Sequence, residues 1–101
     1  MTPTEAERAE AERALAECRR KIDSIDHQLR DLLNQRTQIV EEVLRMKDVL
    51  GMPVHEPNRE DHVIRNVTEG NPGPLPDGSI RRMFECLMQE MREFQNQRRA
   101  R

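Results

Sequence analysis

Residues 15–50 read LAECRRKIDSIDHQLRDLLNQRTQIVEEVLRMKDVL, and this segment dominates the chain. Its apolar positions recur in steps of three and four, which is the spacing of one buried face on an α-helix. The seam positions are Cys18, Ile22, Ile25, Leu29, Leu32, Arg36, Ile39, Val43, Met46 and Leu50. We therefore predict one long helix, which ends where Gly51 and Pro53 interrupt the pattern.

Two cations share the apolar side of this helix. Arg36 occupies a seam position, and Lys47 follows it by eleven residues, which turns it only about 20° in direction. A charge on a buried side needs an anionic ligand or a carboxylate partner. Each cation also has an explanation without function, because Arg36 suits a buried ion pair and Lys47 suits the helix dipole.

Two shorter helices are predicted after the long one. Pro57 suits the first position of a helix that ends near Gly70, and Asp77 or Ser79 suits the cap of another. Their buried positions are expected to be Val63, Ile64 and Val67, and then Ile80, Phe84, Leu87, Met91 and Phe94. Gln95 extends the last stripe with a neutral amide. The predicted fold is all-α, with a long, a short and a medium helix.

Composition restricts the classes of function. The net charge of -2 argues against a nucleic-acid surface. No apolar run of about 18 residues predicts a membrane span. The first twelve residues lack the pattern of a secretory signal, so we expect a cytoplasmic protein without membrane partners.

The chain contains little with which to bury a long helix. It has two Phe and neither Trp nor Tyr, and a helix over residues 15–50 is about 54 Å long. We therefore expect a second copy to cover the seam. Residues 1–14 are interpreted as a helical N-terminal extension and residues 15–101 as the domain. Cys18 and Cys86 lie in apolar helical patterns and are predicted to be buried free thiols.

Polar residues near the end of the long helix form the candidate site. The loop and the second helix bring Glu56, Arg59 and Glu60 toward Lys47, and the third helix brings Gln95. Arginine grips carboxylates with two prongs, and lysine donates to ether or hydroxyl oxygens. Neither a nucleophile with its base nor a metal-ligand spacing accompanies them. The set suits a small dianionic ligand, held without metal or cofactor.

Several motifs are similar to those of one known family. They are Arg19-Arg-Lys-Ile-Asp-Ser-Ile-Asp26, Leu32-Leu-Asn-Gln-Arg36, Lys47, Pro53-Val-His-Glu-Pro-Asn-Arg-Glu60, and Ile80 through Phe84 leading to Gln95. The match covers about residues 18–95. On these motifs the chain resembles the all-α (AroQ) class of chorismate mutases.

The resemblance implies both an activity and an assembly. Members of this class are isomerases that convert chorismate to prephenate, a step of the shikimate pathway toward phenylalanine and tyrosine, and they use no cofactor. They are intertwined helical homodimers, with two active sites that draw residues from both chains. Chorismate is therefore the expected substrate and a second copy the expected partner.

The resemblance also implies roles for the arginines. Arg19 is expected to reach the site of the partner chain, with Arg20 as the alternative in that role. Arg36 is expected to grip a substrate carboxylate within its own chain, and Arg59 to support the same carboxylate network.

The remaining roles concern two oxygens of chorismate, the ether oxygen and the ring hydroxyl. Lys47 and Gln95 are expected to donate to the ether oxygen whose bond breaks, and Glu60 to hold the ring hydroxyl. Glu56 stands where members commonly have aspartate. Met91 stands where some members have serine near a substrate carboxylate.

Other interpretations accompany this one. The turn over residues 71–77 and the following Ile80-Arg-Arg-Met-Phe84 resemble mutase domains associated with or fused to DAHP synthase, which makes that enzyme a possible partner. A non-catalytic regulatory helical domain and an isochorismate-pyruvate lyase are the alternative functions.

Overall fold

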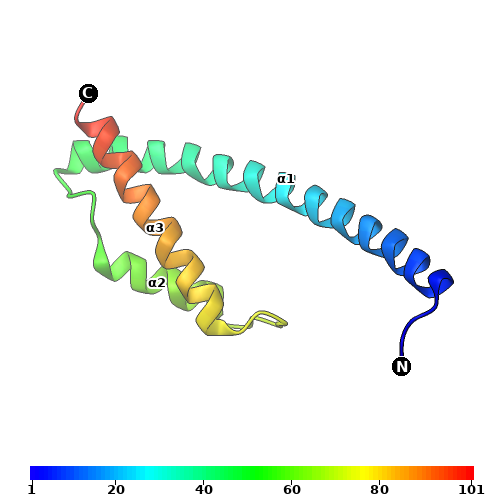
Figure 1. Cartoon of the computed structure of the whole chain (residues 1–101). Helices are drawn as coiled ribbons and strands as arrows, with labels where there is room; N and C mark the ends of the chain where they lie inside the picture. The colour runs from blue at the N-terminus through cyan, green and yellow to red at the C-terminus, as the bar shows by residue number, and fades with distance from the viewer. The chain divides into compact units, whose positions relative to one another are not determined.

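The computed structural model describes residues 1–101 and consists of three α-helices joined by short loops (Figure 1). Helix α1 spans Glu5–Leu50, α2 spans Pro57–Thr68 and α3 spans Asp77–Arg99. No strand is present. The predicted all-α class, with a long, a short and a medium helix, is therefore confirmed. None of the three helices has both the length and the apolar character needed to cross a membrane.

Helix α1 begins before the apolar seam does. The hydroxyl Oγ1 of Thr4 accepts a hydrogen bond from the backbone N–H of Glu7 at 3.1 Å, and the helix starts at Glu5. This contact satisfies one of the donors that every helix start leaves without a partner inside the helix. Most of the predicted extension, residues 1–14, thus belongs to the same continuous helix.

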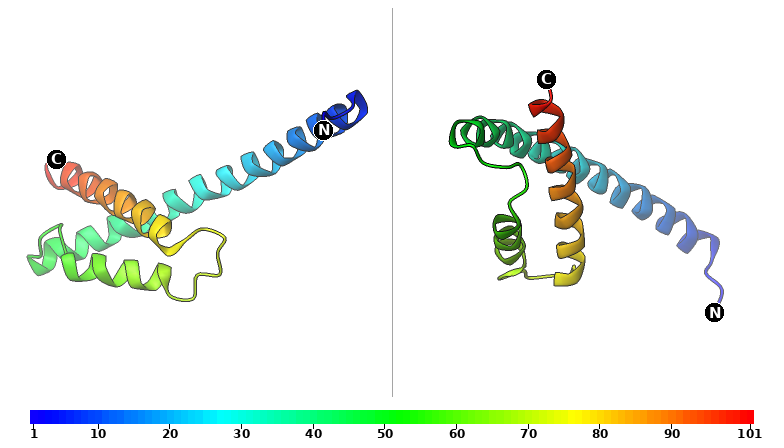
Figure 2. Two further views of the ribbon diagram at one scale, coloured as in Figure 1. Left: turned by 60° about the horizontal axis from the view of Figure 1, so that its bottom comes forward. Right: turned by 90° about the vertical axis from the view of Figure 1, so that its left-hand side faces the viewer.

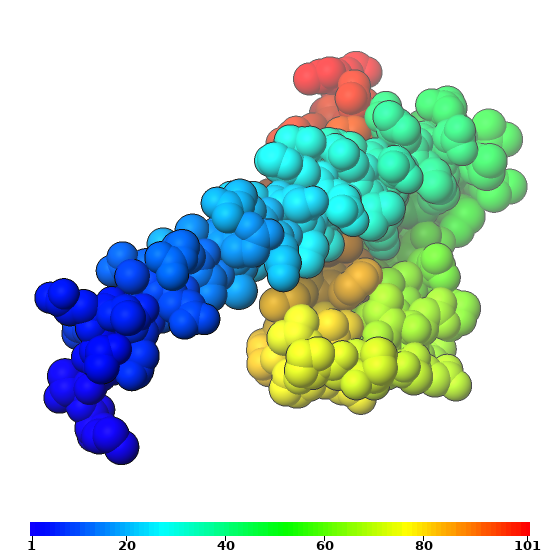
Figure 3. Space-filling view, turned by 90° about the vertical axis from the view of Figure 1, so that its right-hand side faces the viewer, coloured from blue at the N-terminus to red at the C-terminus, as the bar shows by residue number.

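The chain divides into two units, residues 1–36 and residues 37–101. The first unit is the N-terminal part of α1, whose beginning is blue in Figure 3. The large apolar side chains of its helical part are 43–58% exposed. They are Leu15, Ile22, Ile25, Leu29, Leu32 and Leu33. This unit therefore presents an apolar stripe to its surroundings instead of enclosing a core.

Both cysteines are free, as predicted, but both are exposed. The predicted burial was wrong for two different reasons. Cys18 lies on the seam of α1, whose apolar side chains are themselves exposed in the single chain. Cys86 lies two residues before the buried Met88, which turns it about 200° away from that side of α3.

Residues 37–101 contain a small core between α2 and α3, which lie side by side (Figure 2). Val63, Ile64 and Met88 are buried there, and Phe84 packs against them. These residues lie on the apolar sides that the sequence predicts for the two shorter helices. Their meeting fixes the third helix beside the second.

At the end of α1, the residues that follow the helix hydrogen-bond back to its last turn. Gly51 has a positive φ of 66°, which glycine adopts without steric cost. Across it, the N–H of Met52 donates to the carbonyl oxygen of Lys47 at 2.8 Å, and the N–H of Gly51 donates to that of Asp48 at 3.4 Å. This pair of bonds is the Schellman end of a helix. Pro57 then starts α2, as predicted.

The predicted cap of α3 was wrong. Pro76 is the N-cap, and neither Asp77 nor Ser79 supplies a side-chain cap bond. The carboxylate oxygen Oδ1 of Asp77 instead accepts from Nδ2 of Asn71 at 2.8 Å. The side chain of Asp77, which was predicted to cap α3, is thus bound by Asn71 instead. This contact ties the preceding turn to the start of α3.

Candidate active site

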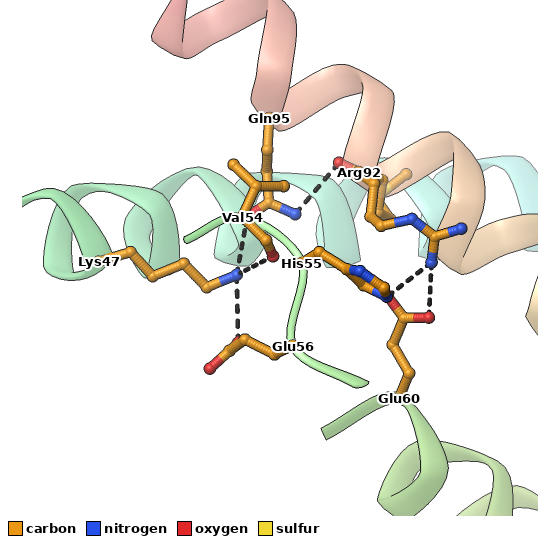
Figure 4. Close-up of polar contacts among 8 residues, drawn as sticks. Lys47, Val54, His55, Glu56, Glu60, Arg92 and Gln95 are labelled. Carbon is orange, nitrogen blue, oxygen red and sulfur yellow. Dashed lines mark hydrogen bonds and ion pairs between the residues drawn. The ribbon is translucent and has the colours of Figure 1, made fainter. Parts of the chain in front are cut away.

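Lys47 is the centre of a buried polar network in residues 37–101. It lies in the last turn of α1 and is only 5% exposed. Its Nζ donates to the backbone oxygen of Val54 at 2.8 Å and to Oε1 of Gln95 at 3.1 Å, and it lies 3.1 Å from Oε2 of Glu56 (Figure 4). An ammonium carries three protons, so these three acceptors can use all of them. The buried cation is therefore fully compensated by protein groups.

The loop between α1 and α2 supplies two of these three acceptors. The side chain of Val54 is buried, which anchors the loop and directs its carbonyl group at Lys47. Glu56 is the N-cap of α2, and its side chain is 28% exposed. The first contact is thus held by the backbone, whereas the second depends on a flexible side chain that reaches solvent.

Gln95 brings a neutral amide from α3 to the same ammonium. It is 6% exposed, and its Nε2 donates to the backbone oxygen of Met91 at 3.1 Å. Because a lysine only donates, the amide oxygen must face Lys47 and the amide nitrogen must face away. An amide at this position accepts a hydrogen bond from Lys47 without adding a charge to the site.

A second pair of charges lies beside the contacts of Lys47 and is counted here as part of the same network (Figure 4). Nη1 of Arg92 on α3 donates to Oε1 of Glu60 on α2 at 2.5 Å and to Oε2 at 2.6 Å. Nε2 of His55 lies 3.8 Å from Oε2 of Glu60, which is beyond hydrogen-bond distance. The Glu60 carboxylate is therefore held mainly by Arg92.

The network balances two cations, Lys47 and Arg92, with two carboxylates, Glu56 and Glu60. Its members are hydrogen-bond donors and acceptors, with no serine or cysteine nucleophile among them. Nowhere in the chain do three or more His, Cys, Asp or Glu side chains gather as a metal site would require. An arrangement of this kind acts on a ligand by orientation and by electrostatic stabilisation.

Of the four other predicted site residues, Met91 joins this network only through its backbone oxygen, which accepts from Gln95. Arg59 is exposed, and its Nη1 lies 3.2 Å from Nδ1 of His62. The sulfur of Met91 accepts from the hydroxyl of Thr37 at 3.5 Å. Arg19 and Arg36 belong to residues 1–36, where Arg19 is exposed and Arg36 is half-buried. The expected roles of these four residues stay predictions.

Sequence reasoning missed two members of the network, Arg92 and the carbonyl group of Val54. A backbone carbonyl has no signature in the sequence. Arg92 had a weak one, because it precedes Gln95 by three residues and so lies about 60° from it on the same helix. A cation three residues before the predicted site residue Gln95 was the only sequence feature that pointed to Arg92.

Comparison with known families and proteins identifies the class. The family model for chorismate mutase type II matches residues 18–96, and the chain belongs to this family. Over 84 residues it is 30% identical to the chorismate mutase of Methanocaldococcus jannaschii, an alignment that covers 82% of this chain and 85% of that protein. Over 72 residues it is 39% identical to the bifunctional chorismate mutase/prephenate dehydratase of Neisseria gonorrhoeae. The chain spans only 19% of the length of that bifunctional protein.

Solved structures agree with this assignment. Form II of chorismate mutase from Thermus thermophilus is similar with a TM-score of 0.79 and 29% identity, over 82% of this chain and 94% of that one. Form I of the same enzyme gives a TM-score of 0.74 and 31% identity, over 77% of this chain and 98% of that one. The predicted family is therefore confirmed by both sequence and fold.

Proposed function

We propose that this chain is a chorismate mutase, which rearranges chorismate to prephenate in a site built around Lys47. The observation that carries the proposal is the buried contact of Lys47 with Gln95, an ammonium and a neutral amide 3.1 Å apart, in a member of the chorismate mutase family. The relatives described above are named as chorismate mutases. This favours mutase activity over a non-catalytic regulatory domain and over an isochorismate-pyruvate lyase.

The chemistry of the reaction matches the content of the network. The ether C–O bond of chorismate breaks while a new C–C bond forms, so the step needs no acid, base, nucleophile or cofactor. Its rate depends on holding the side chain of the substrate over the ring and on stabilising negative charge at the ether oxygen. A buried ammonium whose protons are already directed by protein groups supplies this stabilisation with little reorganisation.

Binding of chorismate requires Lys47 to exchange one acceptor for the ether oxygen. The carbonyl of Val54 belongs to the backbone of an anchored loop and stays in place. Glu56 holds Lys47 through a side chain that is 28% exposed, so we propose that the substrate displaces this contact. Gln95 adds a second donor to the ether oxygen when its amide turns from the carbonyl of Met91 toward the substrate.

The other predicted residues complete the proposed site. Glu60 receives the ring hydroxyl, Arg36 grips a substrate carboxylate with Arg59 supporting the carboxylate network, and Met91 borders a substrate carboxylate. Arg19 enters from a partner chain. The charges support this division, because chorismate carries two carboxylates, whereas Lys47 and Arg92 are already paired with Glu56 and Glu60.

The activity is tested by following the loss of chorismate absorbance after addition of the purified protein. The product should convert to phenylpyruvate in acid, which identifies it as prephenate. A folded protein that leaves chorismate unchanged would contradict the proposal and favour a regulatory domain. Formation of salicylate and pyruvate from isochorismate, without turnover of chorismate, would instead identify the lyase.

We further propose that the chain acts as an intertwined homodimer. The support is the apolar stripe of α1, on which Ile22, Ile25, Leu29 and Leu32 are each 52–58% exposed. Stripes of this length on soluble proteins mark interaction surfaces. A second copy offers an identical stripe of equal length, as a two-fold dimer requires.

Substitution of Leu32 by glutamate is expected to break the dimer, because a charge would then lie in the apolar interface. The mass in solution should fall from about twice the 11.9 kDa of the chain to the single value, and mutase activity should fall at least about tenfold with it. Asn34→Glu is the matched control. It lies two residues along the same helix and so points about 200° away. If analytical ultracentrifugation finds the Leu32→Glu variant still dimeric, the proposal that α1 forms the interface is excluded.

Gln95→Glu is expected to confine activity to acid pH. An ionised carboxylate beside Lys47 pairs with the ammonium and repels the charge that develops on the ether oxygen. Only the protonated carboxyl donates, so activity should rise as the pH falls through the titration of that group. The pH profile of kcat checks this, with Gln97→Glu, an exposed position on the same helix, as the control. A profile unchanged from that of the wild type would exclude Gln95 from the ether-oxygen role.

Association with DAHP synthase is a separate proposal, supported by the resemblance of the turn over residues 71–77 and of the following residues 80–84. Co-purification of the two proteins, and the activity of each in the mixture, test it. Two activities that stay unchanged, without a complex, would exclude the partnership.

A further inference from the structure

Arg92 is the member of the network to which the proposed mechanism gives no role. It joins α3 to Glu60 on α2, 32 positions away in the chain. Both side chains are well covered, 30% exposed for Arg92 and 24% for Glu60. One guanidinium nitrogen bridges both oxygens of the carboxylate, at 2.5 and 2.6 Å. Such a contact leaves the carboxylate little freedom to turn.

We infer that Arg92 is a positioning residue, which holds the carboxylate of Glu60 in the orientation that receives the ring hydroxyl of chorismate. The inference rests on the mutase function proposed above. A glutamate has three rotatable bonds, and a free one must lose that freedom when it binds a ligand. Pairing with Arg92 restricts those bonds before the substrate arrives, which is the advantage of a preorganised site.

The carboxylate keeps the capacity to bind substrate while Arg92 holds it. Two carboxylate oxygens offer about four lone-pair positions, and the bridge from Nη1 uses only two of them. The remaining positions accept a hydroxyl proton. Arg92 therefore orients Glu60 without competing for the same proton.

No neighbouring cation replaces Arg92 in this contact. His55 lies 3.8 Å from Glu60 and its side chain is 59% exposed. Arg59, the preceding residue in the sequence, is directed at His62 instead. Loss of Arg92 would thus leave Glu60 without a hydrogen-bonding cation from its own unit.

The test compares Arg92→Ala with Arg99→Ala on the same helix. Arg99 has a similarly covered side chain, 34% exposed, and pairs with Asp48 at 2.8 Å outside the network. It therefore controls for the loss of any interhelical ion pair on α3. Arg92→Ala is expected to lower kcat/KM for chorismate about 10- to 100-fold, whereas Arg99→Ala should stay within about twofold.

Two readouts separate positioning from a structural role. In a Glu60→Gln background, Arg92→Ala should cause no further loss, because Arg92 acts only through Glu60. Guanidinium ion at non-denaturing concentrations should restore part of the activity of Arg92→Ala and none in the double variant. A hollow of about 490 Å³ borders Arg92 and gives the ion access.

Each contrary result has its own meaning. Additive losses in the double variant would overturn the inference by showing that Arg92 acts independently of Glu60. Equal losses in the Arg92→Ala and Arg99→Ala variants would overturn it by showing a general effect on α3. Normal activity of Arg92→Ala would overturn it while leaving the mutase function intact. A wild-type protein without turnover of chorismate would overturn the proposed function and this inference together.

Discussion

Replacement of Lys47 by alanine is expected to lower kcat for chorismate about 100- to 1,000-fold, the usual cost of removing one preorganised donor from a developing oxyanion. Lys47 is 5% exposed and directs its three protons at Val54, Gln95 and Glu56. No other cation in the described network contacts Gln95. The rate should therefore fall much more than the affinity, because the donor acts on charge that appears only in the transition state.

Steady-state kinetics with chorismate check this prediction. The matched control is Arg45→Ala, which removes an exposed cation two residues earlier on α1, about 200° away from Lys47 in direction. Lys47→Met separates catalysis from packing, because it keeps most of the aliphatic stem while it removes the charge. Circular dichroism and thermal unfolding establish that each variant is folded. A folded Lys47→Met variant with near-normal kcat would exclude Lys47 from the ether-oxygen contact.

The Arg19→Ala and Arg36→Ala variants, each inactive alone, are expected to regain activity when they are mixed under subunit exchange. In the proposed dimer, each site takes Arg36 from its own chain and Arg19 from the partner. A mixed dimer then has one site in which both arginines are intact. Equal mixing makes half of the dimers mixed, so about a quarter of all sites, and of the wild-type activity, should return.

The Arg36→Ala and Lys47→Ala variants form the control pair for this experiment. In the proposed dimer each site takes both Arg36 and Lys47 from one chain, so one site of a mixed dimer lacks Arg36 and the other lacks Lys47. No recovery is therefore expected. Repeating the experiment with Arg20→Ala in place of Arg19→Ala decides which of the two arginines reaches the site of the partner chain. Absence of recovery in the Arg19 and Arg36 mixture, despite proven subunit exchange, would contradict the shared site.

The order of the helices, the end of α1 and the start of α2 followed from local patterns in the sequence. The three-and-four spacing of apolar residues, Gly51 after α1 and Pro57 at the start of α2 each act through neighbours only a few positions away. The burial of Lys47 followed from the same helical geometry, because its direction on α1 matches that of the apolar side. The motifs over residues 19–60 were sufficient to indicate the family, since their register runs without a gap.

Other features depended on how the helices pack. The pairing of Arg92 with Glu60 joins positions 32 apart in the chain. It exists because α2 and α3 pack side by side. The neighbouring Arg59 carries the same charge, yet it is directed at His62 because of its different place on α2. Asn71 likewise engaged Asp77 and changed the cap of α3. Long polar side chains reach several partners, so local sequence selects the helix and its apolar side, whereas helix packing selects which charges meet.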